Sequence, residues 1–232
     1  MKRIGVLIPE TNLVVEDEIY KLYENNVIST NDVIFHILRT PFNTRYSKDY
    51  NKFLKEITIN QKEIIKNLKI ENLDYLSSFC TSAAEMMKDY QSNMCFNSAD
   101  SLVEAGKFLE INKCLLITPY NEFIGLGIEE LLERNDIKIV KKKHINLLHS
   151  FDYVAYGYKK LANLIFKEYS NECENIIISC TNLPTMHFIN KIEKKLNTKI
   201  VSSNSSMFWK IIKDNKIFYN DRKIGKLFQK KI

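Results

Sequence analysis

Two stretches one hundred residues apart share one plan, residues 76–82 (LSSFCTS) and residues 176–182 (IIISCTN). In each, a short run with apolar character is followed by Cys-Thr and then by a small polar residue. A short bounded run of this kind is typical of a buried parallel strand. Cys80 and Cys180 are therefore predicted to lie where strands end, and open α/β sheets bind their ligands at the carboxyl ends of strands.

The duplication extends beyond the two cysteines. Residues 4–12 (IGVLIPETN) resemble residues 114–121 (CLLITPYN), because each is an apolar strand followed by a proline and a polar turn. The first of these strands begins 76 positions before Cys80, and the second begins 66 positions before Cys180. We therefore predict an α/β fold of two similar parallel-sheet units related by a pseudo-twofold axis. The active site would lie between them, with one cysteine from each side.

Strands and helices alternate along the whole chain, which indicates parallel sheets with crossover helices. Strands are expected near residues 3–9, 32–38, 74–79, 94–96, 113–118, 137–146, 175–179 and 199–202. The lysine-rich strand 137–146 is expected near a sheet edge. A helix is predicted from about Ser82 to Asp89, and another after Cys180 with Pro184 in its first turn. The mostly polar loop 41–49 is a candidate lid.

The composition is that of an ordinary soluble globular protein, with 45% hydrophobic and 27% charged residues in 232. The sequence has no apolar run long enough to span a membrane and no signal-peptide pattern, so we expect a cytoplasmic protein. The five cysteines are odd in number and include no CxxC, which argues against a disulfide framework and a zinc site. The four histidines have no ligand spacing, so no metal is expected.

The sequence also bears on whether a nucleotide cofactor or a nucleic acid is expected as a partner. No glycine-rich phosphate loop follows a strand, so no nucleotide cofactor is signalled. The net charge of +6 comes with lysine-rich stretches at 141–143, 191–195 and 226–231. Solvated lysine faces explain these better than a nucleic-acid surface, because no recognition motif accompanies the charge.

Two thiols at strand ends can carry out chemistry. Unpaired N–H groups and the dipole of a following helix would lower a thiol pKa, and the thiolate is the reactive form. Two thiols facing one carbon can act as base and acid, or as nucleophile and acid. Neutral donors nearby could hold a carboxylate. The candidate donors are Asn12, Thr81, Ser82, Tyr120, Thr181 and Asn182.

Simpler interpretations stand beside this one. A free cysteine often behaves as a small buried hydrophobe, and we assign Cys95, Cys114 and Cys173 to packing. Asn12 could serve as a helix N-cap and Tyr120 as a packed aromatic. Trp209 is expected in the core.

On these residues the chain resembles the aspartate/glutamate racemase superfamily, and within it maleate cis–trans isomerase and arylmalonate decarboxylase. The resemblance is carried by residues 3–12, 80–82, 116–120, 179–182 and 201–204. It implies a site between two units, with no cofactor. It also implies that the C-terminal segment completes the first unit, so the domains would be residues 1–96 with 204–232, and residues 97–203. Relatives are often dimers, so a homodimer is a candidate assembly, although the sequence itself does not give the oligomeric state.

The resemblance implies a cofactor-independent isomerase of a small carboxylate. Cys80 would add to the substrate as nucleophile and Cys180 would supply and recover a proton. Arylmalonate decarboxylases keep one of the two cysteines, so the pair argues against that activity. The alternatives are an amino-acid or hydantoin racemase or epimerase using the same thiols, and a catalytically silent binding relative. Glu10 and the loop 41–49 are expected to set the substrate.

Overall fold

The structure, a computed structural model, describes residues 1–42, 50–68, 72–82, 95–220 and 224–230. Its strands form two four-stranded sheets, and every pair of neighbouring strands is parallel. The first sheet has the order β2-β1-β3-β4 and the second has the order β6-β5-β7-β8. The strands are β1 (Lys2–Pro9), β2 (Val33–Thr40), β3 (Tyr75–Ser78), β4 (Cys95–Asn97), β5 (Lys113–Thr118), β6 (Lys138–His144), β7 (Asn175–Ile178) and β8 (Lys199–Ser202).

The second sheet repeats the order of the first strand for strand, which confirms the prediction of two similar parallel-sheet units. The repeat extends to single hydrogen bonds. Phe79, just before Cys80, donates its N–H to the Leu7 carbonyl of β1 at 2.8 Å. Ser179, just before Cys180, donates to the Ile117 carbonyl of β5 at 2.9 Å. Both cysteines therefore leave their sheets at equivalent points, at the carboxyl end of the third strand of each unit.

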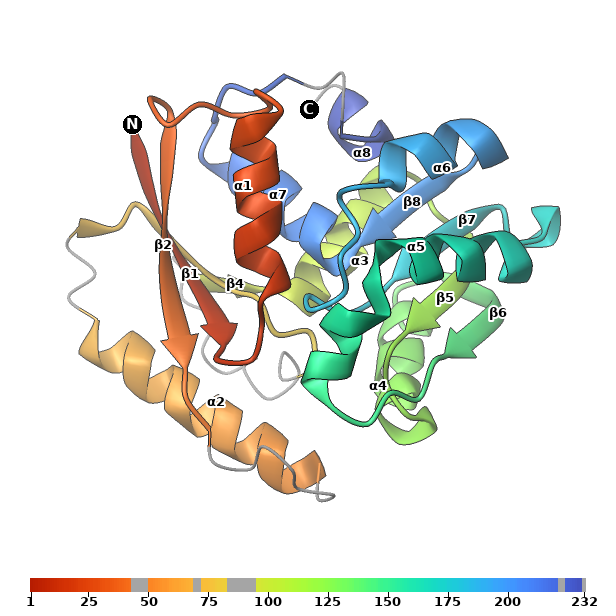
Figure 1. The fold of residues 1–232 in the computed structure, drawn as a ribbon, viewed down its shortest axis with the longest axis horizontal. Coiled ribbons are helices and arrows are strands. Elements are labelled where there is room, and N and C mark those ends of the chain that lie inside the picture. Colours follow the sequence, from red (N-terminus) through yellow and green to blue (C-terminus); the bar gives the residue numbers. More distant parts are fainter. Residues whose placement is uncertain (43–49, 69–71, 83–94, 221–223, 231–232) are drawn as a thin grey trace.

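Helices connect and cover the strands (Figure 1). They are α1 (Val14–Glu24), α2 (Tyr50–Asn67), α3 (Ser98–Phe108), α4 (Glu122–Glu133), α5 (Ser150–Glu168), α6 (Ile189–Leu196), α7 (Ser203–Asp214) and the short α8 (Lys226–Gln229), with a 3-10 turn at Asn171–Cys173. None of the described helices is both long and apolar enough to cross a bilayer.

Burial follows from this architecture. Ile176, Ile177 and Ile178 of β7 are fully buried, because a central parallel strand has both faces covered. By contrast β6 lies at the edge of its sheet, and its lysines 141–143 are exposed, as predicted. Trp209 is fully buried in the core, also as predicted.

Helix α7 lies between the two units (Figure 1). Its Phe208 meets Phe79 and Phe35 of the first unit, with ring centroids 5.4 and 6.2 Å apart. The next residue, Trp209, packs on Phe108 of α3 at 4.9 Å. The tail helix α8 contacts β8 and α7. The division of the chain at residues 97 and 204 remains a prediction.

The segment after Cys180 differs from the prediction. No helix follows directly, because residues 181–188 form turns and irregular backbone and α6 begins at Ile189. Pro184 therefore lies in irregular backbone and not in the first turn of a helix. The reason is tertiary: the buried Glu18 carboxylate accepts the N–H groups of Thr185 and Met186, at 2.6 and 2.8 Å. The predicted helix after Ser82 and most of the loop 41–49 lie outside the described residues.

Candidate active site

The structure brings the two cysteines together at the carboxyl ends of β3 and β7. Both side chains are buried, Cys80 with 5% and Cys180 with 4% of its surface exposed. The two thiols lie near enough to interact electrostatically, since Cys80 contributes to the raised pKa of Cys180. Neither is in a disulfide. Cys114 and Cys173 are fully buried in the core cluster, as predicted.

The Cys180 sulfur is surrounded by hydrogen-bond donors. The N–H of Asn182 donates to it at 3.3 Å, and the Tyr120 hydroxyl donates to it as well. These bonds favour the thiolate, yet burial outweighs them and raises the pKa of Cys180 to about 12. For Cys180 the predicted lowering of the pKa is therefore wrong, because no helix begins there and the site is desolvated. Cys180 is a thiol that holds its proton.

The Cys80 sulfur has different neighbours. It belongs to a small apolar cluster with Phe42 and Ile57, against which Phe53 and Leu54 pack. The Ser82 hydroxyl lies 3.7 Å from the sulfur. Among the described residues this side of the site is therefore more apolar than the Cys180 side.

Asn12 and Thr181 join the two units behind the thiols. Asn12 caps α1, because its Oδ1 accepts the N–H groups of Val14 and Val15 at 3.0 and 3.2 Å. Its Nδ2 donates to Thr181 Oγ1 at 3.1 Å, and the Thr181 hydroxyl donates in turn to the Phe79 carbonyl at 2.9 Å. Asn12 thus satisfies the first N–H groups of α1 from the residue before its N-cap position, Leu13, and its amide also bridges to the loop of the other cysteine.

Arg39, at the end of β2, braces the Asn12 turn. Its guanidinium donates to the carbonyls of Glu10 and Asn12 at 2.8 and 3.1 Å and pairs with Glu16. The fixed fork of an arginine suits several acceptors at once. Arg39 belongs to none of the repeated motifs, so the sequence pattern does not predict it as a site residue.

The remaining predicted donors are used inside the protein. The Thr81 hydroxyl donates to Ser203 Oγ at 2.9 Å and accepts from Ser98 Oγ at 3.1 Å. Asn182 ties three segments together: its Nδ2 donates to the carbonyls of Thr11 and Ser150, and its Oδ1 accepts the Leu13 N–H. That these residues also contact a substrate stays a prediction.

Three functional candidates were missed from the sequence. Glu18 is fully buried, and burial raises its pKa to about 7. Asn204 donates from Nδ2 to the Thr181 carbonyl at 3.0 Å. Tyr153 lies against Tyr120, with ring centroids 6.1 Å apart. The one available signal was the acidic start of α1, where Glu18 follows Glu16 and Asp17.

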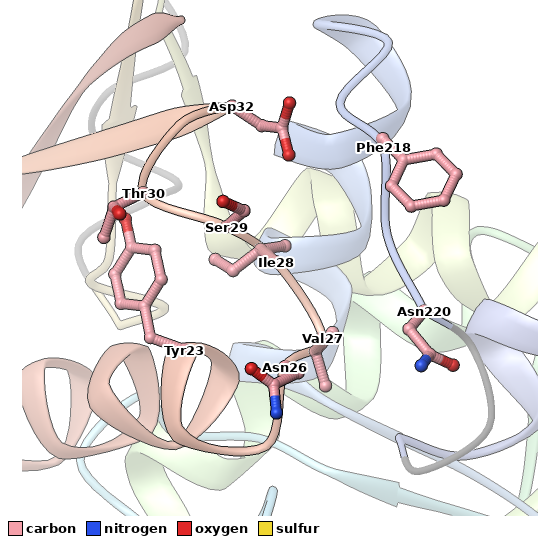
Figure 2. A pocket seen from close by; sticks show the side chains of 9 residues that line it. All are labelled: Tyr23, Asn26, Val27, Ile28, Ser29, Thr30, Asp32, Phe218 and Asn220. Atoms are coloured by element: carbon pink, nitrogen blue, oxygen red, sulfur yellow. The ribbon is translucent and has the colours of Figure 1, made fainter.

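The cavities described do not include the predicted site residues. One of about 330 Å³ lies at the turn between α1 and β2, lined by Tyr23, Asp32, Phe218, Asn220 and residues 26–30 (Figure 2). It adjoins the amino end of β2, whereas the cysteines lie at the carboxyl ends of β3 and β7. Another of about 480 Å³ lies beside Pro41 and the later turns of α2.

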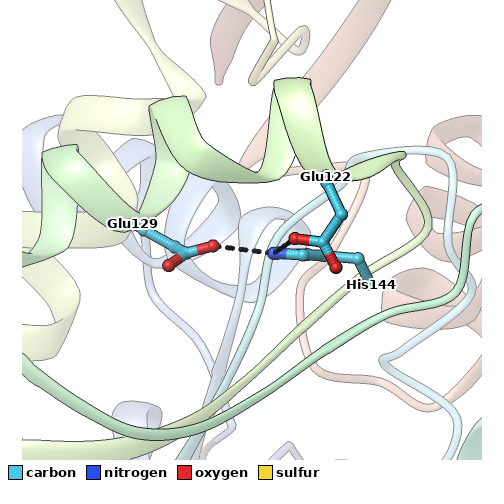
Figure 3. A group of neighbouring side chains, drawn as sticks. All are labelled: Glu122, Glu129 and His144. Atoms are coloured by element: carbon cyan, nitrogen blue, oxygen red, sulfur yellow. Dashed lines mark hydrogen bonds and ion pairs between the residues drawn. The ribbon is translucent and has the colours of Figure 1, made fainter.

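One group of side chains among the described residues has ligand atoms close enough together to hold a metal ion: Glu122, Glu129 and His144 (Figure 3). His144 Nε2 lies 2.8 Å from Glu129, and its Nδ1 lies 2.8 Å from Thr118 Oγ1. Lys142 already pairs with both oxygens of Glu129 at 2.9 Å. The described contacts of this group therefore make it an ion-pair network between α4 and β6.

Solved structures share the fold of this chain. Maleate cis-trans isomerase from Nocardia farcinica, in a cysteine-to-serine mutant with a covalently bound succinylcysteine intermediate, superposes with a TM-score of 0.85 at 15% identity, covering 100% of this chain and 99% of that one. Maleate isomerase Iso from Pseudomonas putida S16 gives 0.85 at 16% identity, over 99% and 98%. A liganded mutant of arylmalonate decarboxylase gives 0.79 at 15%, over 100% of both chains.

The sequence itself places the chain among these proteins. Residues 75–228 match the family model for arylmalonate decarboxylase. The chain belongs to the arylmalonate decarboxylase family, within the Asp/Glu racemase-like superfamily that the motifs had indicated. No curated protein matches it closely.

Proposed function

We propose that this protein is a cofactor-independent cis–trans isomerase of a small unsaturated dicarboxylate, with maleate as the first substrate to test. The observation that carries the proposal is the pair of buried thiols, Cys80 and Cys180, at equivalent strand ends. They lie near enough for Cys80 to affect the pKa of Cys180. Two thiols fit a reaction in which one group bonds to carbon and the other handles a proton.

The relatives support this reaction over decarboxylation. The Nocardia isomerase was captured with a succinylcysteine, which is what a cysteine becomes after adding to maleate. The decarboxylase structure that superposes well is a mutant in which a glycine was replaced by cysteine and a cysteine by serine. A natural decarboxylase therefore has a glycine at a position where that mutant carries a thiol, whereas this chain has two thiols of its own.

The environment of Cys180 supports a division of labour between the thiols. Deprotonated Cys80 forms a C–S bond to one alkene carbon, and the π electrons move to the other carbon, which takes the proton of Cys180. The former double bond then rotates as a single bond. Cys180, now a thiolate, removes the proton, the double bond reforms and Cys80 leaves. The raised pKa of Cys180 suits this role, because the group stays protonated until a carbanion needs its proton.

The test is mass spectrometry of intact protein incubated with maleate. Cys180→Ala is expected to accumulate an adduct of one maleate at Cys80, because addition no longer leads to turnover. Cys80→Ala is expected to form no adduct. An adduct that maps to Cys180 would reverse the roles, and full fumarate production by both variants would refute the paired-thiol mechanism.

Solvent exchange separates this activity from racemisation. A two-thiol racemase exchanges the Cα proton of an amino acid or hydantoin, so deuterium from D₂O enters recovered substrate. We expect maleate to be converted to fumarate, and aspartate, glutamate and hydantoins to show no exchange. Exchange without fumarate formation would favour the racemase.

A further inference from the structure

Tyr153 is an aromatic residue of the site to which no role has been given. It lies in the first turns of α5, with its ring edge-to-face against Tyr120 at an interplanar angle of 74°. Cys180 acts on it electrostatically, as does Asp152. Tyr153 therefore lies with Tyr120 beside the sulfur that handles the proton.

The two tyrosines differ in what their hydroxyls do. The Tyr120 hydroxyl donates to the Cys180 sulfur. The Tyr153 hydroxyl has no hydrogen-bond partner among the described residues, although most of its side chain is enclosed. Burial raises the pKa of Tyr153, so the hydroxyl keeps its proton and remains a donor. The side chain is partly exposed, and its hydroxyl is not among the fully buried atoms without a partner, so a bound molecule can reach this donor.

The backbone fixes Tyr153 in this place. Within α5, Gly157 has φ +72°, a conformation that side chains disfavour, and it breaks the helix into two parts. The first part is tied to the Cys180 loop, because Asn182 Nδ2 donates to the Ser150 carbonyl at 2.8 Å. Its amino-terminal end is also stabilised by a hydrogen bond from the His149 N–H to the Asp152 side chain at 3.0 Å. Figure 1 shows the first part of α5 turning toward the middle of the molecule, away from the line of the second part.

We infer that the Tyr153 hydroxyl binds a carboxylate of the substrate, while Tyr120 serves the Cys180 thiol. This inference rests on the proposed function and adds a substrate-binding residue to it. It assigns to Tyr153 the anchoring that the sequence had suggested for Tyr120. A substrate carboxylate between the two units would supply the acceptor that the Tyr153 hydroxyl lacks.

The test uses adduct formation in the Cys180→Ala background, where the rate of Cys80 labelling is followed against maleate concentration. Adding Tyr153→Phe is expected to raise the half-saturating concentration about 10-fold or more, because it removes one hydrogen bond to a charged group. The limiting labelling rate should change less. Tyr156→Phe is the matched control, since Tyr156 lies on the same helix and is also partly buried, and it should leave both values unchanged.

The folded state supplies a second readout. Because the hydroxyl has no protein partner, Tyr153→Phe should leave the urea midpoint of the wild-type protein unchanged. Labelling that saturates at the same maleate concentration with phenylalanine at position 153 would overturn the inference and leave the proposed function intact. If Cys180→Ala forms no adduct even with tyrosine at position 153, the proposed function fails, and the assignment of Tyr153 fails with it.

Discussion

The loops that carry Cys80 and Cys180 start from the same point of the same sheet pattern, yet they are held in different ways. The Cys180 loop is fixed by side chains from distant segments: Asn182 bonds to residues 11, 13 and 150, Asn204 holds the Thr181 carbonyl, and Glu18 holds residues 185 and 186. In the described residues Cys80 instead meets Phe42 and Ile57.

Buried polar atoms without a hydrogen-bond partner among the described residues occur on both sides. They are Thr40 Oγ1, Thr58 Oγ1 and Gln61 Nε2 on the Cys80 side, and Glu18 Oε2, Ser179 Oγ and Asn204 Oδ1 on the Cys180 side. Such groups cost stability when they remain unpaired. The comparison teaches that a repeated motif determines where a cysteine lies in the fold. The residues around that cysteine determine how firmly its loop is held and whether its thiol keeps its proton.

The largest difference should be seen in turnover. Replacing either cysteine by alanine is expected to lower kcat for maleate by about 10³-fold or more, because each removes a group that forms or breaks a bond. Cys173→Ala is the matched control, since Cys173 is a fully buried thiol that packs in the core. Steady-state fumarate production measures the effect. Near-normal kcat in Cys180→Ala would show that the proton comes from elsewhere.

A second experiment compares the equivalent positions Asn182 and Ser82. Asn182→Ala removes three side-chain hydrogen bonds and should lower the free energy of unfolding by about 2–4 kcal/mol. Ser82→Ala should cost less than about 0.5 kcal/mol, because its hydroxyl makes one weak contact at 3.7 Å. Urea unfolding measures both. Equal losses would mean that the two loops are held alike.

Glu18, on the Cys180 side of the site, should make the free energy of unfolding depend on pH. Its pKa in the folded protein is about 7 against an ordinary 4.5, so the folded state binds this proton more tightly than the unfolded state. The associated stability is fully present below pH 4.5 and is lost as the pH rises to about 7, by up to about 3 kcal/mol. Glu18→Gln should remove this contribution, and Glu24→Gln, an exposed change on the same helix, should not. Urea midpoints measured between pH 4.5 and 8 test this, and an unchanged slope in Glu18→Gln would contradict it.

The smallest expected effect concerns a group without a partner. Thr58→Val keeps the shape of the side chain and removes a buried hydroxyl that has no hydrogen-bond partner within the described part of the chain, so stability should be unchanged or rise by about 1 kcal/mol. Thr181→Val should instead cost about 1–3 kcal/mol, because two hydrogen bonds are lost. Thermal and urea unfolding distinguish them. A loss above 1 kcal/mol in Thr58→Val would reveal a bound partner for that hydroxyl.

The sheets and the positions of the cysteines could be predicted from the sequence because the signals are local. Apolar runs mark the strands, and the two Cys-Thr pairs mark equivalent strand ends. The strand 113–118 was predicted to the residue. These features need no knowledge of what lies nearby in space.

The prediction failed where distant residues decide the local structure. Residues 181–188 form turns and irregular backbone because Glu18, more than 160 positions earlier, takes their N–H groups. The pKa of Cys180 depends on burial between two units, which no motif encodes. The position of Tyr153 beside Tyr120 could not be predicted, because it depends on a break at Gly157 within an otherwise regular helical pattern.

The position of α7 bears on how the chain acquires its fold during synthesis. Phe35 and Phe79 of the first unit pack on Phe208, which leaves the ribosome more than a hundred residues later. Residues 97–202 contain all four strands of the second sheet, so that sheet can assemble while the first unit still exposes two aromatic rings. Translation proceeds at about 5–20 residues per second, so this exposure lasts for seconds. The nascent chain therefore offers chaperones an apolar surface at its amino-terminal half until α7 has emerged.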